Sequence, residues 1–64
     1  MYTNSRDIIR RLQSEGWRLD RIRGSHHIFK NPANGATLPV PHPKPSLGTG
    51  LVLKIYKIAG WAKD

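Results

Sequence analysis

The first apolar pattern in the chain has the spacing of a helix. In the segment NSRDIIRRLQSEGW, a stripe at helical spacing consists of Ile8, Ile9 and Leu12. Asn4 is a residue type that caps helix N-termini, and Gly16 suits the left-handed position after a last turn. Trp17 would then pack back against Leu12, a contact that accompanies such helix ends. We therefore predict a helix bounded by Asn4 and Gly16.

The next segment, WRLDRIR, alternates as a strand does. Trp17 and Leu19 alternate with polar residues, although Ile22 is out of phase with them. A bulge or a strand end near Arg21 would absorb this change of phase. We predict a first strand here, with an irregularity near its end.

Two more strands are predicted downstream. A turn at Gly24-Ser25 leads into the strand HHIFK, and the loop NPANG separates that strand from a third, ATLPVP. Pro39 and Pro41 cannot donate hydrogen bonds to a sheet. The third strand therefore lies at an edge of the sheet or leaves it early.

A second helix is predicted near the C-terminus. Its apolar stripe consists of Leu51, Val52, Ile55, Ile58 and Ala59. Gly60 would end it, and its start lies between Ser46 and Gly50. The resulting order, α-β-β-β-α, is typical of a small α+β domain. Three antiparallel strands would carry both helices on one face and leave the other face free.

The composition indicates one small domain that spans residues 1–64. The chain has no cysteine, which excludes disulfides and thiolate metal sites. It has no apolar run of the roughly 20 residues that cross a bilayer. Its first residues, MYTNSRD, are polar, so we expect no signal peptide. We expect a soluble cytoplasmic protein that has no membrane partner.

The charge of the chain narrows its function further. Eleven Lys and Arg residues against four acidic residues give a formal net charge of +7. Such a balance attracts polyanions, of which RNA and DNA are the usual ones. The acids are scattered along the chain: Asp7, Glu15, Asp20 and Asp64. Because two-metal nucleases need clustered carboxylates, any nuclease chemistry here should be independent of metal.

The stretch GSHHIF places two histidines directly after the predicted turn. In a strand, His26 and His27 point to opposite faces and make a poor metal chelate. One role open to each histidine is that of a half-buried, hydrogen-bonded ring. The other is proton transfer during phosphoester cleavage, because imidazole titrates near neutrality.

The residues around the two histidines suit phosphate chemistry. Candidate phosphate contacts are Arg21, Arg23, Lys30 and Lys44. Gly24 and Ser25 could offer backbone N–H groups or a hydroxyl to an oxyanion. RNA supplies its own nucleophile, the 2′-hydroxyl. An enzyme acting on RNA therefore needs only a base, an acid and charge stabilisation.

Four stretches together resemble the HicA family of small bacterial and archaeal toxins: NSRDIIRRLQSEGW, GSHHIFKNP, LPVPHPK and GTGLVLKIYKIAGW. They occur in order and at family-like spacing over about residues 4–61. The resemblance implies the toxin of a toxin–antitoxin system, an mRNA interferase with a double-stranded-RNA-binding-like fold. It also implies a HicB-type antitoxin that binds and silences the toxin. We expect no cofactor, and a monomer when the toxin is free.

The resemblance also implies roles for individual residues. The catalytic histidine of the family is the first one after the Gly-Ser pair, which is His26 in this chain. Gly24 and Ser25 match the turn that presents it. His27 is given a supporting or packing role, and His42 a structural or substrate-lining one.

Two other functions stay open on the sequence alone. A non-catalytic RNA-binding module of the same fold would use the same Lys and Arg positions. A protein-interaction domain would pair the basic surface with an acidic partner. Cleavage of RNA in the presence of EDTA separates the enzyme from both.

Overall fold

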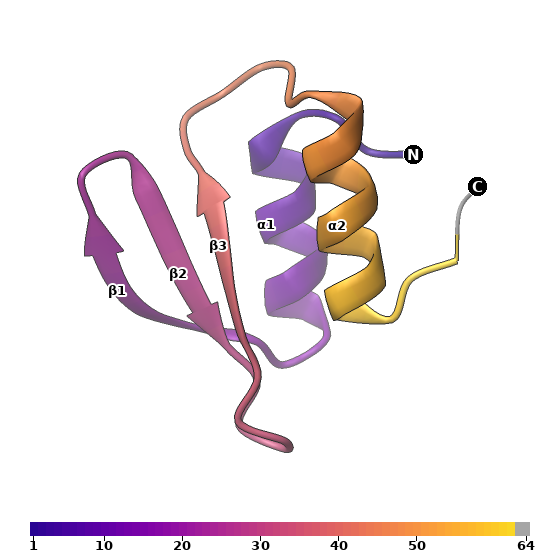
Figure 1. Ribbon diagram of the computed structural model, residues 1–64. Helices are drawn as coiled ribbons and strands as arrows, with labels where there is room; N and C mark the ends of the chain where they lie inside the picture. The colour runs from indigo at the N-terminus through magenta and orange to yellow at the C-terminus, as the bar shows by residue number, and fades with distance from the viewer. Residues whose placement is uncertain (63–64) are drawn as a thin grey trace.

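The computed structural model describes residues 1–62. In chain order its elements are α1 (Ser5–Ser14), β1 (Arg18–Arg23), β2 (His26–Lys30), β3 (Thr37–Pro41) and α2 (Thr49–Ala59). The strands form one antiparallel sheet in the order β1-β2-β3. Both helices lie on the same side of that sheet (Figure 1). The predicted α-β-β-β-α fold is confirmed, and β3 lies at an edge, as its prolines predicted.

The starts of both helices fall where the sequence placed them. The Asn4 side chain caps α1 by accepting a hydrogen bond from the backbone N–H of Arg6 (2.8 Å). The second helix begins at Thr49, with Gly48 in the capping position. This start lies inside the predicted range.

Both helices end with the same glycine–tryptophan pair. After α1, Gly16 has φ +95°, and the backbone N–H of Trp17 donates to the carbonyl of Leu12 (3.0 Å). Gly60 and Trp61 repeat this arrangement after α2, with φ +76° and a hydrogen bond of 2.9 Å. The hydrogen bonds satisfy carbonyls that a last helical turn leaves free. Both tryptophans are buried, and the end predicted for the first helix is confirmed.

The first strand contains a bulge. Leu19 and Arg21 pair with successive residues of β2, so Asp20 is left outside the register. This extra residue brings Leu19 and Ile22 onto the same face of the sheet, because a shift of one residue reverses the direction of every later side chain. The irregularity predicted near Arg21 is therefore confirmed.

The core lies between the helices and the β3 side of the sheet. Its members are Ile8, Leu12, Trp17, Phe29, Leu38, Val40, Leu47, Val52, Ile55, Tyr56 and Trp61. Both helices contact β3, and β1 contributes no residue to this cluster. As a result, Leu19 and Ile22 face the helix side but remain 45% and 54% exposed.

The buried stripe predicted for α2 is only partly correct. Val52 and Ile55 are fully buried, but Ile58 is 38% exposed. Tyr56, which the stripe left out, is buried and accepts a hydrogen bond from the backbone N–H of Tyr2 through its hydroxyl (2.7 Å). The helix is therefore rotated about its axis relative to the prediction, so that the Tyr56 ring is buried and Ile58 is partly exposed.

Candidate active site

His26 opens β2 on the side of the sheet that the helices leave free. It is paired with Arg23 in β1 and with Pro41 in β3, and directly paired residues of antiparallel strands project to the same face. The opposite face carries Phe29 and Val40, which are 1% and 0% exposed. His26 itself is exposed, and no hydrogen bond within residues 1–62 engages its ring. Its imidazole is accessible to a substrate from solvent.

Two features fix the conformation of the turn before His26: the backbone angle of Gly24 and a hydrogen bond to Ser25. Gly24 has φ +59°, a left-handed conformation that is costly for a residue with a side chain. The carbonyl of Ser25 accepts a hydrogen bond from the backbone N–H of His42 (2.8 Å). This contact continues the pairing of β2 and β3 past Pro41. The backbone that carries His26 is therefore fixed by the sheet on both sides.

Three rows of side chains cross the open face. Starting at the turn, the paired positions are Arg23–His26–Pro41, Arg21–Ile28–Pro39 and Arg18–Lys30–Thr37. In a regular strand Arg18 and Arg21, three residues apart, would point to opposite faces. The bulge at Asp20 puts them on the same face. One column of the open face, on β1, consists entirely of arginines.

The structure brings most of the predicted phosphate contacts together. Three of them share the open face with His26: Arg21, Arg23 and Lys30. Lys44 is elsewhere, because its backbone N–H and carbonyl bond to Ser5 at the start of α1 (2.8 and 3.0 Å). Arg18 also lies on this face, although it was not among the predicted phosphate contacts. The change of phase along β1 could have indicated this position, because the bulge that absorbs the change also decides the face on which Arg18 lies.

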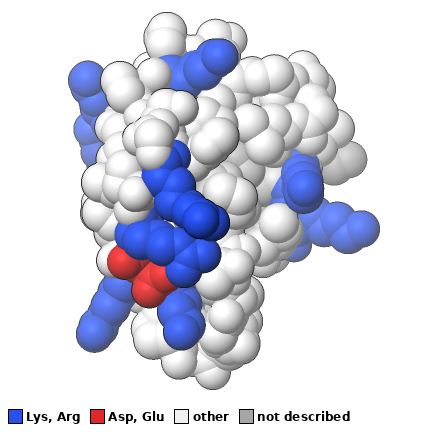
Figure 2. Space-filling view, turned by 60° about the vertical axis from the view of Figure 1, so that its left-hand side comes forward, with Lys and Arg blue, Asp and Glu red and all other residues white. Residues whose placement is uncertain are grey.

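The surface around β1 is strongly basic. A view that brings this side of the molecule forward shows Lys and Arg side chains gathered beside a small acidic patch (Figure 2). The carboxylate of Asp20 lies 3.3 Å from the guanidinium of Arg21, and the side chains are 36% and 57% exposed, respectively. Exposed ion pairs of this kind are weak. The pair leaves Arg21 able to exchange Asp20 for a phosphate.

The other two histidines lie on the opposite side of the sheet. His27 is paired with the buried Val40, and its ring meets that of His42 edge to face, with 4.9 Å between the centroids. The hydroxyl of Ser5, which is 1% exposed, shares a hydrogen bond with His42 Nδ1 (2.8 Å). The Nδ1 atom of His27 is buried and has no hydrogen-bond partner in the described chain. This corner joins α1 to the sheet, and it does not share a face with His26.

Metal-ligating side chains are not grouped in the described chain. Within residues 1–62, no three His, Cys, Asp or Glu side chains lie close enough to hold an ion together. Neither described helix has the length and apolar character needed to cross a membrane.

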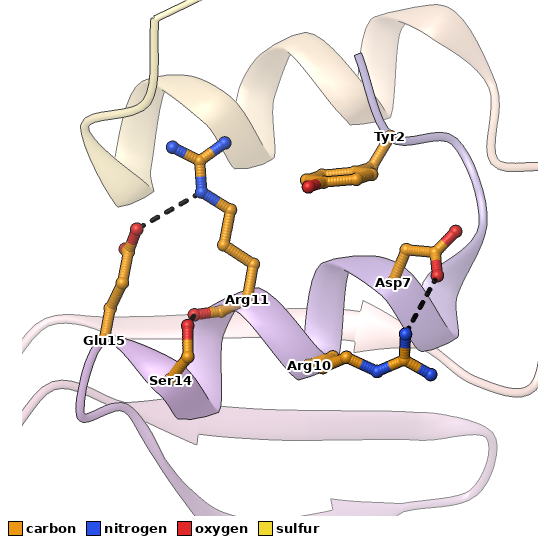
Figure 3. A pocket seen from close by; sticks show the side chains of 6 residues that line it. All are labelled: Tyr2, Asp7, Arg10, Arg11, Ser14 and Glu15. Atoms are coloured by element: carbon orange, nitrogen blue, oxygen red, sulfur yellow. Dashed lines mark hydrogen bonds and ion pairs between the residues drawn. The ribbon is translucent and has the colours of Figure 1, made fainter.

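An open pocket on α1 is a poor candidate site. It is lined by Tyr2, Asp7, Arg10, Arg11, Ser14 and Glu15 (Figure 3). Its charges are already paired, because Arg10 lies 3.9 Å from Asp7 and Arg11 donates to Glu15 (3.2 Å). It contains no residue of the sheet and none of the three histidines.

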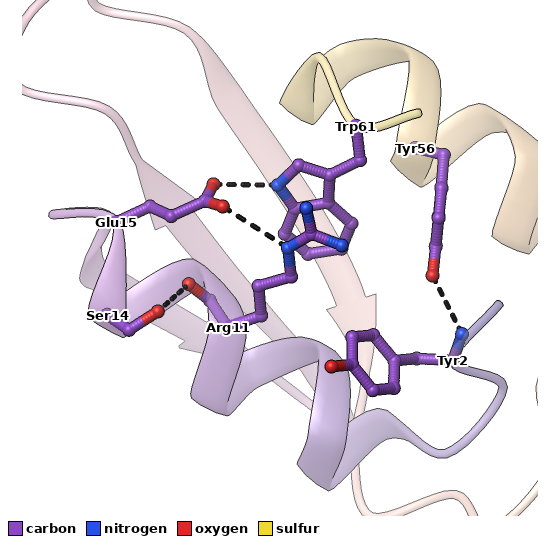
Figure 4. Close-up of polar contacts among 6 residues, drawn as sticks. All are labelled: Tyr2, Arg11, Ser14, Glu15, Tyr56 and Trp61. Carbon is purple, nitrogen blue, oxygen red and sulfur yellow. Dashed lines mark hydrogen bonds and ion pairs between the residues drawn. The ribbon is translucent and has the colours of Figure 1, made fainter. Parts of the chain in front are cut away.

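The charged residues of this pocket have a structural role. Glu15 also accepts a hydrogen bond from the indole N–H of Trp61 (2.7 Å), and the Arg11 guanidinium lies over the Trp61 ring at 4.3 Å (Figure 4). We call this set of three residues the Glu15 clasp. It ties the end of α2 to the end of α1, so its charges are committed to the fold.

A comparison with protein families identifies the chain. Residues 5–61 match the family described as HicA toxin of bacterial toxin-antitoxin. The chain belongs to the HicA toxin family. No curated protein matches it. As a HicA-family chain it has the role of the toxin in a toxin–antitoxin system, and such a system includes an antitoxin partner.

Proposed function

We propose that this HicA-family toxin is a metal-independent endoribonuclease that cleaves mRNA in the cytoplasm, with His26 as a proton-transfer group. One observation carries the proposal. His26 is an exposed imidazole directly paired with Arg23 on an open, cationic face. Imidazole moves protons near neutrality, and a guanidinium binds phosphate oxygens in two-point contacts. Cleavage of mRNA would stop translation and growth.

The reaction uses the 2′-hydroxyl of the RNA itself as its nucleophile. The ribose 2′-oxygen attacks the adjacent phosphorus, the bond from phosphorus to the 5′-oxygen breaks, and a 2′,3′-cyclic phosphate and a 5′-hydroxyl result. A base takes the proton of the 2′-hydroxyl, and an acid gives a proton to the leaving 5′-oxygen. His26 performs one of these transfers, and solvent water performs the other. Arg23 stabilises the charge that develops on the phosphate oxygens.

Neighbouring residues take supporting roles in this proposal. Gly24 and Ser25 hold the turn and present backbone N–H groups near the reacting phosphate, and His27 supports the strand from its packed side. Arg21 and Lys30 bind flanking phosphates from the same face. Lys44 binds the RNA outside these rows, since its backbone is attached to α1.

We propose that the antitoxin is a HicB-type protein that covers the His26 side of the sheet. A positively charged surface speeds association with an acidic partner. Covering this face would exclude RNA from His26 directly. Competition between RNA and the antitoxin for the free toxin tests this arrangement, and simultaneous binding of both would argue against it.

The replacement His26→Ala tests the catalytic assignment. Purified wild type and variant are incubated with 5′-labelled mRNA in EDTA, and the ends of the products are analysed. Wild type should yield 2′,3′-cyclic phosphate ends, and the variant should yield none while it keeps its fold and its affinity for RNA. Cleavage by His26→Ala at the wild-type rate would falsify the assignment. Intact RNA with both proteins, despite binding, would favour the non-catalytic RNA-binding module.

A further inference from the structure

We infer that the RNA on the open face is an unpaired strand that runs along β1, with its phosphates on the arginines and its bases over a neighbouring apolar strip. This inference rests on the proposed function and adds the class of substrate. Two groups of residues carry it. The arginine column consists of Arg18, Arg21 and Arg23, and the apolar strip consists of Ile28, Pro39 and Pro41.

The open face has a charged side and an apolar side, as a single RNA strand has a phosphate side and a base side. Three of its paired cations lie along one edge, on β1, and Lys30 lies at the end of β2 away from the turn, while β2 and β3 contribute the apolar strip beside the arginines. A single RNA strand has phosphates along one side and bases along the other, and proteins that bind such strands combine a basic track with surfaces that contact the bases. A duplex keeps its bases inside and is recognised through phosphates and 2′-hydroxyls. The apolar strip would then have no base to contact.

The spacing of the cations fits successive phosphates. Residues two apart in a strand, such as Arg21 and Arg23, are about 6.7 Å apart along it. This is the order of the spacing between successive phosphates of an extended strand. The bulge at Asp20 lengthens the step to Arg18 and keeps that residue on the same face. The column therefore offers sites for about three phosphates in line.

The proposed reaction also requires a strand that is free to bend. The 2′-oxygen must lie in line with the bond that breaks, and the regular backbone of an A-form duplex does not allow this geometry. The row that contains His26 lies beside the Gly24 turn, at one end of the column. The scissile phosphate would then sit over Arg23 and His26. The strand would continue in one direction along the sheet, over Arg21 and Arg18.

The test compares a single strand with a duplex at several salt concentrations. The single-stranded probe is a short, labelled 2′-O-methyl RNA of mixed sequence, which cannot be cleaved, and the duplex is the same strand paired with an unmodified RNA complement, whose 2′-hydroxyls stay available for recognition. We expect wild type to bind the single strand about tenfold more tightly than the duplex. The three phosphate contacts of the arginine column should contribute about −2 to the slope of its salt dependence, and each replacement in the column by Gln should reduce the slope by about 0.7.

Two further variants separate the parts of the site. Ile28→Thr should weaken binding of the single strand without changing the slope, because it removes an apolar contact and no charge. Arg10→Gln is the matched control, since Arg10 is a highly exposed arginine on α1 and pairs only with Asp7. It should change the slope much less than any residue of the column. Duplex binding as tight as single-strand binding, or an effect of Arg10→Gln as large as that of Arg21→Gln, would overturn the inference.

The outcomes distinguish this inference from the proposed function. If wild type cleaves a duplex and a single strand at equal rates through His26, the substrate class is wrong and the catalytic assignment stands. If single strands are bound as described but His26→Ala cleaves like wild type, the catalytic assignment is wrong and the RNA path stands. If only an acidic protein binds the open face, and no RNA does, both are wrong.

Discussion

The backbone N–H of His42 donates a hydrogen bond to the carbonyl of Ser25, at 2.8 Å. The segment after β3 therefore secures the turn that presents His26, although His42 and His26 lie on opposite sides of the sheet. His42 acts on the open face through its backbone, while its ring is engaged with Ser5 and His27 on the other side. The position of the exposed histidine thus depends on a corner at the opposite side of the sheet.

Breaking that corner should destabilise the fold. Ser5→Ala leaves the backbone N–H of Lys44 and the ring of His42 without their shared partner at a site that is 1% exposed. We expect a loss of about 1–3 kcal/mol in the free energy of unfolding, measured by urea denaturation. Ser14→Ala is the control, because its exposed hydroxyl bonds only to the carbonyl of Arg11. The control should stay within about 0.5 kcal/mol of wild type. Equal effects of the two changes would contradict a special role for Ser5.

The conformation of the turn gives a second prediction. Gly24→Ala should cost about 1 kcal/mol, because φ +59° is unfavourable for a residue with a Cβ, although no atom lies within 4 Å of where that Cβ would be. Gly50→Ala also meets nothing within 4 Å, but Gly50 lies in the first turn of α2. It should raise stability, by up to about 1 kcal/mol. Thermal unfolding of both variants tests whether the two changes in stability have opposite signs. A stabilising Gly24→Ala would show that the turn does not need its left-handed residue.

Removing metal ions should leave RNA cleavage unchanged. The described residues offer no group of three side chains that could hold an ion, and the proposed reaction uses an imidazole and a guanidinium. Cleavage rates are measured after dialysis against EDTA and again after magnesium is restored. A metal-dependent nuclease in parallel reactions shows that the chelation is complete. Loss of activity in EDTA with recovery in magnesium would refute the metal-independent mechanism.

The Glu15 clasp should contribute measurable coupling between the two helix ends. Trp61→Phe removes the indole donor, and Glu15→Ala removes its acceptor. In a double-mutant cycle we expect a coupling energy of about 1 kcal/mol, since the hydrogen bond is partly buried and its acceptor is charged. The exposed pair of Asp7 and Arg10, 3.9 Å apart, is the matched comparison and should give less than about 0.5 kcal/mol. A clasp coupling no larger than this would mean that it does not hold α2 in place.

Much of the fold was predictable because its signals are local. A helix cap, a glycine after a last turn and the prolines of an edge strand each act within a few residues, and all three are as predicted. A bulge or a strand end near Arg21 was also predicted, because Ile22 is out of phase with Leu19, and the structure contains the bulge. Strand alternation alone predicted that His26 and His27 lie on opposite faces, and the packing of the sheet against the helices decides that His26 is on the open one.

The remainder depends on contacts between distant parts of the chain. The helical stripe of α2 could not show which residues the narrow sheet covers, so Ile58 was placed inside and Tyr56 was missed. The partnership of Ser5 with His42 joins α1 to the segment after β3, and no local pattern marks it. Arg18 was missed for a different reason. Its face follows from the bulge, but only when the register is counted through it.

The unpaired residue at position 20 has a consequence for how this strand can change. Because it offsets the alternation by one step, the length of β1 determines which of its side chains meet solvent on the open face of the sheet. Deleting Asp20 would turn the Arg18 side chain toward the helices and the Leu19 side chain toward the open face, although neither residue is substituted. Deletions and insertions in β1 would therefore move charged side chains from one face of the sheet to the other. Most single substitutions would change the charge of these faces less.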